Sequence, residues 1–280
     1  MVFVRGNPLD FERWASYDLP KWSYKNVLPY FKKLETWSGG ENLYRGGNGP
    51  LKVNRSKIDD AFPLFKSLIK AAAEAGYDTF EDSNGFKQDG FGTFDVTIDN
   101  GQRQGVSRAY LKEINGYKNL SIEHNTDVSK IIFKEKKAIG VEVKRNNHTE
   151  IYYCNKEIIL SSGSINSPKI LQLSGIGDEK VLNQNGIEII NHLPGVGKNL
   201  QDHLEIYIQH KSKIKDTLYN LSTNYFTQAV EGAKWFLLKK GMLTYSHLEV
   251  GGFVKTSEKY KHPNIQLHFF PSLVINHGLT

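Results

Sequence analysis

The most informative segment of this sequence is GSINSPKILQLSGIG, which spans residues 163–177. It follows an apolar run at residues 157–160, which predicts a strand. Ser167 has the chemistry of a helix N-cap, Pro168 suits the first helical position, and Gly175 suits the end of the helix. A strand, a tight glycine turn and a helix together bring backbone close to a ligand. We therefore expect a ligand-facing turn where this segment begins.

Short strands precede this segment. Residues 131–133, 138–144 and 150–154 are rich in apolar, β-branched and aromatic side chains, and polar turns separate them at 134–137 and 145–148. Strands of this length joined by short turns predict a small meander that leads into the strand at 157–160.

Three amphipathic helices are predicted elsewhere in the chain. Residues 22–37 have helical spacing, with Ser23 as the N-cap, and Pro29 should kink or split this helix. Residues 60–76 form a second helix, from Asp60 as the N-cap to Gly76 as the stop. A third helix is expected at about 223–240.

Strands and turns complete the expected organisation. Residues 250–254 and 265–270 predict strands, and DSNG at 82–85 and DNG at 99–101 are strong turn signals. The stretch 82–105 is rich in Asp, Asn and Gly, which predicts a long ordered excursion between sheet elements.

Composition predicts a globular protein. The 280 residues are 39% hydrophobic and 12% aromatic, enough for one large domain or two ordinary ones. The formal net charge is +6, but the lysines are scattered, with pairs at expected helix ends and turns. This pattern is typical of a solvated surface, so we expect no nucleic-acid partner.

Cysteine usage and hydropathy exclude several classes of protein. Cys154 is the single cysteine of the sequence, so an internal disulfide cannot form, and we expect no metal site. No apolar run approaches the ~20 residues that cross a bilayer, and residues 1–5 do not resemble a signal peptide. We expect a cytoplasmic protein that is at most peripheral at a membrane.

A glycine-rich loop at residues 195–200 reads GVGKNL but does not match a phosphate-binding motif. A dinucleotide loop needs a third glycine where Leu200 stands, and a P-loop needs Ser or Thr where Asn199 stands. Taken alone, this segment predicts a structural turn.

Several motifs together resemble one enzyme family. Residues 163–177 resemble the second signature of the glucose-methanol-choline (GMC) oxidoreductases, and LPGVGKNLQDHL at 193–204 follows where that family carries the same loop. MVFVRGN at residues 1–7 resembles the strand after the family's first flavin-contacting signature. Further matches keep family order along essentially the whole chain.

The resemblance implies an α/β fold of mixed α+β character. We expect an incomplete Rossmann-like FAD/NAD(P)-binding domain from residues 1–45 and 100–204. An interleaved substrate domain with an antiparallel sheet is expected from residues 46–99 and 205–280.

Segments 205–207, 247–253 and 263–269 most resemble the choline-oxidising members of the family. This implies FAD-dependent oxidation of a primary alcohol, choline to betaine aldehyde in glycine betaine synthesis, with hydride transfer to the flavin. The electrons then pass to an acceptor that the resemblance does not specify, and peripheral association with the inner membrane is a further implication. Two alternatives stay open: another alcohol dehydrogenase or oxidase of the family, and a non-catalytic truncated remnant.

The resemblance also places parts of the active site outside this sequence. The dinucleotide loop is expected before Met1 and the catalytic histidine after Thr280, so no catalytic residue is assigned here and we expect the isolated chain to be inactive. His203, His247 and His268 are interpreted as structural or pocket-lining residues.

By analogy with family positions, four residues are expected to contact the cofactor. Met1 should lie near the flavin ring, the backbone of Val128 should reach the adenine, and Ser162 and Gly163 should let the ADP part approach. Ordinary strand-end and turn positions are the alternative for these residues.

Glu249 matches the family carboxylate that faces a quaternary ammonium group. Such a cation cannot donate a hydrogen bond, so its site needs negative charge or aromatic faces. A solvated strand glutamate is the alternative for this residue.

Overall fold

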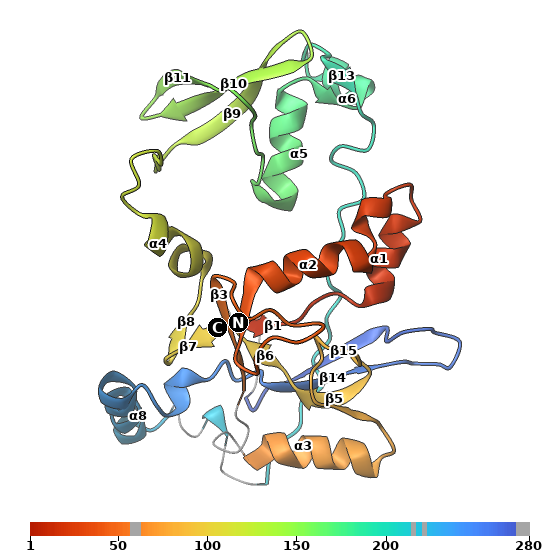
Figure 1. Ribbon diagram of the computed structural model, residues 1–280, viewed down its shortest axis with the longest axis vertical. Coiled ribbons are helices and arrows are strands. Elements are labelled where there is room, and N and C mark those ends of the chain that lie inside the picture. The colour runs from red at the N-terminus through yellow and green to blue at the C-terminus, as the bar shows by residue number, and fades with distance from the viewer. Residues whose placement is uncertain (57–62, 214–216, 220–222, 273–280) are drawn as a thin grey trace. The chain divides into compact units, whose positions relative to one another are not determined.

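The computed structural model describes residues 1–56, 63–213, 217–219 and 223–272. The chain forms two compact units. Unit 1 comprises Met1–Tyr117 and Tyr207–Thr280, and unit 2 comprises Lys118–Ile206. Both units mix helices with small sheets, in agreement with the expected mixed α/β character (Figure 1).

The described part of unit 1 contains two four-stranded sheets, in the orders β1-β6-β3-β2 and β15-β14-β5-β4, and a β7–β8 pair. The strands are β1 (Val2–Phe3), β2 (Glu35–Trp37), β3 (Leu51–Arg55), β4 (Thr79–Phe80), β5 (Gly90–Thr93), β6 (Asp95–Val96), β7 (Ile98–Asp99), β8 (Gln102–Arg103), β14 (Val250–Val254) and β15 (Ile265–Phe269). The last two confirm the strands expected near 250 and 265.

The second sheet joins two distant segments of the chain. β14 pairs antiparallel with β5, from Val250 opposite Thr93 to Phe253 opposite Gly90, and also with β15. Phe80, Phe94 and Phe253 form a buried aromatic cluster against this sheet, with two valines of the N-terminal segment packed on it. The N-terminal strand and the β14 region therefore share one core.

The turn signals at 82–85 and 99–101 are confirmed. The Gly85 amide donates to the Asp82 carbonyl at 3.1 Å. Asn100 and Gly101 both have positive φ, 49° and 66°, between the antiparallel strands β7 and β8. Two positive φ values in a two-residue loop match the right-handed twist of a hairpin.

The helices in the described part of unit 1 are α1 (Pro8–Ala15), η1 (Pro20–Trp22), α2 (Tyr24–Leu34), α3 (Pro63–Glu74), η2 (Ser107–Leu111), α4 (Lys112–Ile114), α8 (Tyr225–Leu238) and η3 (Met242–Thr244). The expected helix at 223–240 is confirmed as α8, whose N-cap Asn224 accepts from the amides of Phe226 and Thr227. Gly76, with a φ of 85°, follows α3 as expected. The expected N-cap Asp60 lies outside the described residues.

Pro29 was expected to kink or split this helix, and the split was wrong, because α2 is one continuous element with Pro29 inside it. Pro29 and Lys25 are both exposed, so water can satisfy the Lys25 carbonyl that loses its intrahelical donor. The cost of proline is therefore tolerated at this position.

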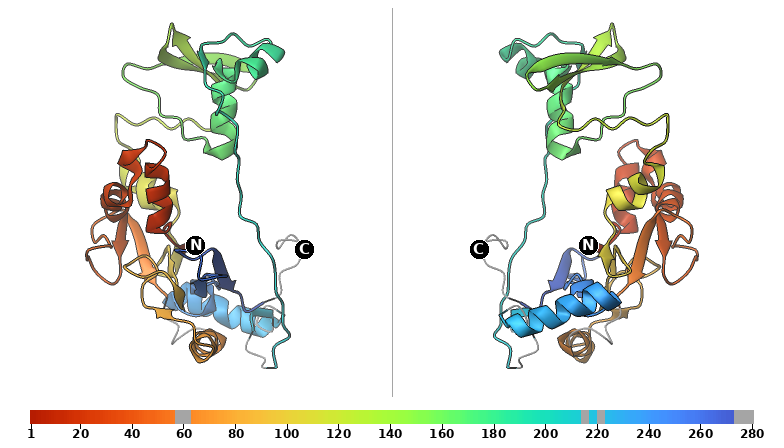
Figure 2. Two further views of the ribbon diagram at one scale, coloured as in Figure 1. Left: turned by 90° about the vertical axis from the view of Figure 1, so that its right-hand side faces the viewer. Right: turned by 90° about the vertical axis from the view of Figure 1, so that its left-hand side faces the viewer.

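Unit 2 is built on a three-stranded antiparallel meander of β9 (Asp127–Lys134), β10 (Lys137–Arg145) and β11 (His148–Tyr153). This confirms the predicted meander. Its remaining elements are α5 (Gly163–Leu173), β12 (Ile176–Gly177), α6 (Glu179–Gln184) and β13 (Asn191–His192), with β12 and β13 parallel. Helix α5 lies beside the meander in the views of Figure 1 and Figure 2.

A buried serine ties α5 to the meander. The Ser174 hydroxyl accepts from the Ile131 amide of β9 at 2.7 Å and donates to the Ile170 carbonyl at 2.5 Å. This places the C-terminal end of α5 on the buried middle of β9.

Two expectations for unit 2 were wrong. Residues 157–160 are not a strand, and Ile159 is 79% exposed. A strand forms only where a neighbouring strand pairs with its backbone, and no strand pairs with this segment in the described residues. Helix α5 begins at Gly163 and not at Ser167, and Pro168 lies inside it. The Ser167 hydroxyl instead accepts from the Ser162 amide at 3.0 Å, so it closes the turn before the helix.

Candidate functional site

Glu249 is fully buried immediately before β14, with 0% of its surface exposed. Its Oε1 accepts from the backbone amides of Ser246 at 2.5 Å and His247 at 3.1 Å. Its Oε2 is also buried and has no hydrogen-bond partner among the described residues. The alternative of a solvated strand glutamate therefore does not hold.

Burial raises the pKa of the Glu249 carboxyl above its ordinary value, and the hydrogen bonds from Ser246 and His247 oppose this rise. A buried carboxylate that lacks one set of partners is unfavourable unless a positive charge approaches it. The arrangement can therefore bind a cation.

Met1 lies in the same unit as Glu249. Its carbonyl accepts from the Thr97 amide at 2.9 Å, and the adjacent β1 pairs with β6.

The Phe94 backbone connects these two residues, because its amide donates to the Glu249 carbonyl at 2.7 Å directly before β6. Phe94 itself is fully buried, and its ring lies 5.4 Å from the His268 ring. The unit 1 part of the predicted site thus has a rigid aromatic support.

Ser162 and Gly163 form the exposed N-terminal end of α5. Ser162 is the N-cap residue but makes no side-chain capping hydrogen bond. Gly163 has a φ of 85°, and no atom lies within 4 Å of the position that a Cβ would take. The Ser162 side chain therefore does not cap the first backbone amides of α5, and the space beside Gly163 is open. Free amides at a helix N-terminus suit an anionic group.

Val128 lies near the start of β9, opposite Val143 of β10, and is 39% exposed. It belongs to unit 2 together with Ser162 and Gly163, and α5 packs against β9. The structure therefore brings Met1 and Glu249 together in one unit and places the other three predicted residues in the second unit.

The three histidines singled out in the sequence differ in environment. His203 is exposed, and so is His268 on β15. His247 is partly buried, and burial lowers the pKa of its imidazole. Its backbone is unusual, with a φ of 66°.

A buried ion cluster supports unit 1, and sequence reasoning missed it. Arg45 is fully buried and binds both oxygens of Glu35, at 2.8 and 3.2 Å, as well as Asp82 at 2.7 Å and Asp95 at 2.6 Å. Arg5 binds the same Glu35 at 2.7 Å. The partners come from distant segments, so no local pattern in the sequence could have revealed the cluster.

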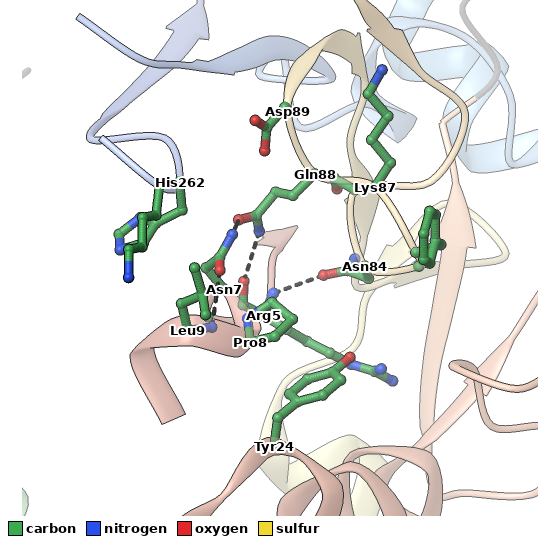
Figure 3. Close-up of a pocket in the computed structure, with 15 residues that line it drawn as sticks. Arg5, Asn7, Pro8, Leu9, Tyr24, Asn84, Lys87, Gln88, Asp89 and His262 are labelled. Carbon is green, nitrogen blue, oxygen red and sulfur yellow. Dashed lines mark hydrogen bonds between the residues drawn. The ribbon is translucent and has the colours of Figure 1, made fainter. Parts of the chain in front are cut away.

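A cavity of about 270 Å³ also lies in unit 1, between the loop before α1, the loop 83–89 and the turn at Lys261 and His262 (Figure 3). The side-chain amides that line this cavity already make hydrogen bonds within the protein. The Asn7 amide donates to the Gln88 side-chain oxygen at 3.0 Å, and the Gln88 amide donates to the Arg5 carbonyl at 3.2 Å. The Asn84 amide donates to the Phe3 carbonyl at 3.0 Å. None of the five predicted site residues lines it.

The described residues contain neither a cluster of metal ligands nor a membrane-spanning helix. No group of three or more His, Cys, Asp or Glu side chains there could hold a metal ion. No helix in the described part of the chain has the length and apolar character needed to span a bilayer.

Relatives with established names share nearly the whole of this chain. The chain is 44% identical over 279 residues to the oxygen-dependent choline dehydrogenase of Staphylococcus xylosus, covering 98% of this chain and 49% of the relative. It is also 44% identical to the mitochondrial choline dehydrogenase of Homo sapiens, covering 99% of this chain and 46% of the relative. The chain thus spans about half the length of the curated relatives it matches.

Solved structures and a family profile agree with these relatives. An FAD-dependent oxidoreductase from Chaetomium thermophilum superposes with a TM-score of 0.82 at 34% identity, covering 90% of this chain and 46% of that one. A formate oxidase shares the fold with a TM-score of 0.83 at 23% identity, covering 97% of this chain and 52% of that one. The GMC oxidoreductase profile matches residues 1–205. The chain belongs to the GMC oxidoreductase family.

Proposed function

We propose that this chain supplies the substrate headgroup site and part of the cofactor bed of an FAD-dependent enzyme that oxidises choline to betaine aldehyde. The observation that carries the proposal is Glu249, a fully buried carboxylate whose Oε2 has no partner among the described residues.

A quaternary ammonium group fits this carboxylate. The trimethylammonium headgroup of choline is positively charged and has no N–H to donate, so it compensates the charge of Oε2 without needing a hydrogen bond. A neutral alcohol would leave the buried charge uncompensated, which is costly. The site therefore favours a cationic alcohol over a sugar or a simple alcohol.

The proposed cofactor is FAD, which supplies the hydride acceptor when bound. The exposed turn at Ser162 and Gly163 fits its phosphates, because the helix N-terminus offers amides and a positive dipole end and the glycine has no side chain in the way. Val128 is an exposed strand residue of the same unit, and Met1 stays assigned to the flavin side. In this proposal the chain itself binds and orients.

The relatives support the same conclusion. Both the staphylococcal and the human relative are named choline dehydrogenases, and both match the chain from end to end. An alcohol oxidase or dehydrogenase with another substrate is the second candidate, and the substrate profile distinguishes it.

The test uses the full-length protein that contains this chain, with the substitution Glu249→Gln. This change keeps the shape of the side chain and removes its charge. We expect the KM for choline to rise about tenfold or more, which corresponds to a loss of about 1.4 kcal/mol. The KM for 3,3-dimethyl-1-butanol, the neutral tert-butyl isostere, should change less than about twofold.

Flavin content serves as the control, since Glu249 is not assigned to the cofactor. Equal losses for both alcohols would show that the substitution damages the fold. An unchanged KM for choline would remove Glu249 from the substrate site and favour another alcohol.

We further propose that α8 attaches the protein peripherally to an anionic membrane. Tyr225, Phe226, Phe236 and Leu237 are between 71% and 86% exposed, and their spacing places them on one face of the helix. Lys239 and Lys240 follow the helix and supply positive charge. Apolar side chains beside lysines are typical of helices that lie in the membrane interface.

Vesicle sedimentation tests this attachment. The chain should sediment with vesicles of equal parts phosphatidylglycerol and phosphatidylcholine, and less with phosphatidylcholine alone. Phe236→Asp should abolish sedimentation, whereas Gln228→Asp, on another part of the helix, serves as the charge-matched control. Equal sedimentation of both variants with wild type would exclude α8 as the attachment site.

A further inference from the structure

The turn before β14 holds one oxygen of Glu249 and leaves the other uncommitted. Oε1 accepts two successive backbone amides, from Ser246 and His247, at 2.5 and 3.1 Å. The Ser246 hydroxyl in turn accepts from the Leu248 amide at 3.3 Å. Two successive amides therefore hold Oε1, and the Ser246 hydroxyl fixes the Leu248 amide of the same turn.

The backbone of His247 makes this arrangement possible. Its φ of 66° lies in the left-handed region, which residues other than glycine seldom adopt. Residues in that region persist where the surrounding structure requires them, and they cluster at ligand sites. An ordinary φ at position 247 would turn its amide away from Glu249.

We propose that His247 is a positioning residue, whose left-handed backbone fixes Oε1 of Glu249 so that Oε2 alone faces the substrate cation. In this role the peptide group of His247 acts, and its imidazole does not. The inference rests on the proposed headgroup site and adds the element that orients it.

The choice of residue at position 247 then matters only through backbone preference. Glycine adopts the left-handed region freely, and asparagine and histidine adopt it more readily than most residues. Alanine resists it, and β-branched valine is a strong outlier there. A variant that relaxes to an ordinary φ must restore the turn each time substrate binds, so its binding weakens.

The experiment measures choline KM and kcat in the full-length protein for four variants at position 247: Gly, Asn, Ala and Val. We expect His247→Gly and His247→Asn to stay within about twofold of wild type in KM, and His247→Ala to raise KM about tenfold or less. His247→Val should raise KM further, and kcat should change little in all four. If the valine variant does not fold, the alanine and glycine pair decides the question.

Asn147 provides the matched control, because its φ of 65° is close to the 66° of His247 but it lies in the β10–β11 turn of unit 2. Asn147→Ala carries the same backbone strain and should leave the choline KM unchanged. If backbone strain acted only through global stability, Asn147→Ala and His247→Ala would change the choline KM equally.

The outcomes separate this inference from the headgroup proposal. If glycine and asparagine raise KM as much as valine, the imidazole acts and the positioning role is overturned. If Glu249→Gln raises KM but no variant at 247 does, the headgroup site stands and the positioning role falls.

If Glu249→Gln leaves KM unchanged, the headgroup proposal fails, and the turn is judged by the amide proton shifts of residues 246 and 247 in the chain. These protons should move upfield in Glu249→Gln and His247→Val and stay in place in His247→Gly. Unmoved shifts in His247→Val would overturn the positioning role.

Discussion

The two units carry their predicted site residues in opposite ways. In unit 1, Glu249 is fully buried and its Oε1 is fixed by two amides. In unit 2, Ser162 and Gly163 are exposed, and nothing lies over the glycine. In unit 1 the carboxylate is shielded from water, which makes its charge costly unless a cation approaches it. In unit 2 the backbone at Gly163 is accessible, which lets a ligand approach it closely.

One ion pair from each unit shows the same difference. In unit 1, Arg45 and Glu35 are fully buried within the cluster, and Arg45 also stacks 4.4 Å from the centre of the Trp37 ring. In unit 2, the Lys130 and Glu142 side chains are 48% and 23% exposed on neighbouring strands. Buried pairs tolerate little change, whereas exposed ones contribute little.

The largest expected effect follows from this contrast. Arg45→Met leaves Glu35, Asp82 and Asp95 without their shared cation, and we expect unit 1 to lose about 3 to 5 kcal/mol of unfolding free energy. Lys130→Met is the matched change in unit 2 and should cost less than about 1 kcal/mol. Urea unfolding and hydrogen exchange of the chain measure both values. Similar losses for the two variants would break the comparison.

The next effect concerns the exposed turn of unit 2. Gly163→Ala forces a side chain into a φ of 85°, and we expect it to cost about 1 to 2 kcal/mol of stability. Gly195→Ala is the control, since Gly195 also has open space around it but no left-handed φ. That control should be neutral in the same unfolding measurement.

The same glycine tests the cofactor assignment. In the full-length protein, Gly163→Leu should lower the ratio of flavin to protein more than it changes alcohol preference, because a bulky side chain blocks close backbone approach. An unchanged flavin ratio would return Ser162 and Gly163 to an ordinary turn.

The smallest effect is the pH dependence that Glu249 confers on unit 1. Burial raises its folded-state pKa above the unfolded value, near 4.5. The contribution of Glu249 to stability is therefore fully present below the unfolded pKa and is lost as pH rises through the folded pKa. Without ligand at neutral pH, Glu249→Gln should therefore be more stable than wild type.

Urea unfolding from pH 4 to pH 8 measures this difference between wild type and Glu249→Gln, and the difference should vanish toward the acid end. The comparison of two chains cancels the titration of the other carboxylates. A variant less stable than wild type at neutral pH would mean that the hydrogen bonds to Oε1 outweigh the cost of burial.

Local elements were predictable where a segment carries its own signal. The hairpin turn at Asn100 and Gly101, α8 and the β9–β11 meander all follow from turn chemistry and apolar spacing within short windows. The strand expected at 157–160 did not form, because its existence depends on a paired neighbour and not on its own residues. Helix α5 began early, because the Ser167 hydroxyl bonds the Ser162 amide and does not cap a helix of its own.

The candidate site divides along the same line. Its residues were named from motifs, yet the burial of Glu249, the left-handed turn at His247 and the cluster around Arg45 had no local signature. The burial of Glu249 and the cluster depend on groups that the fold brings together from distant segments, such as Glu35 and Asp95 around Arg45. The turn at His247 forms within residues 246–249, and its left-handed φ is visible only in the structure.

The sequence by itself determined the family and the turns and helices that short-range chemistry specifies, because motif spacing and side-chain preference are properties of neighbouring residues. Only the tertiary structure decided which charges are buried and which backbone is open. Glu249 directly precedes β14 of the sheet β15-β14-β5-β4, and its carbonyl accepts from Phe94 of the aromatic cluster. Desolvation is a property of that assembled surrounding and not of any one residue.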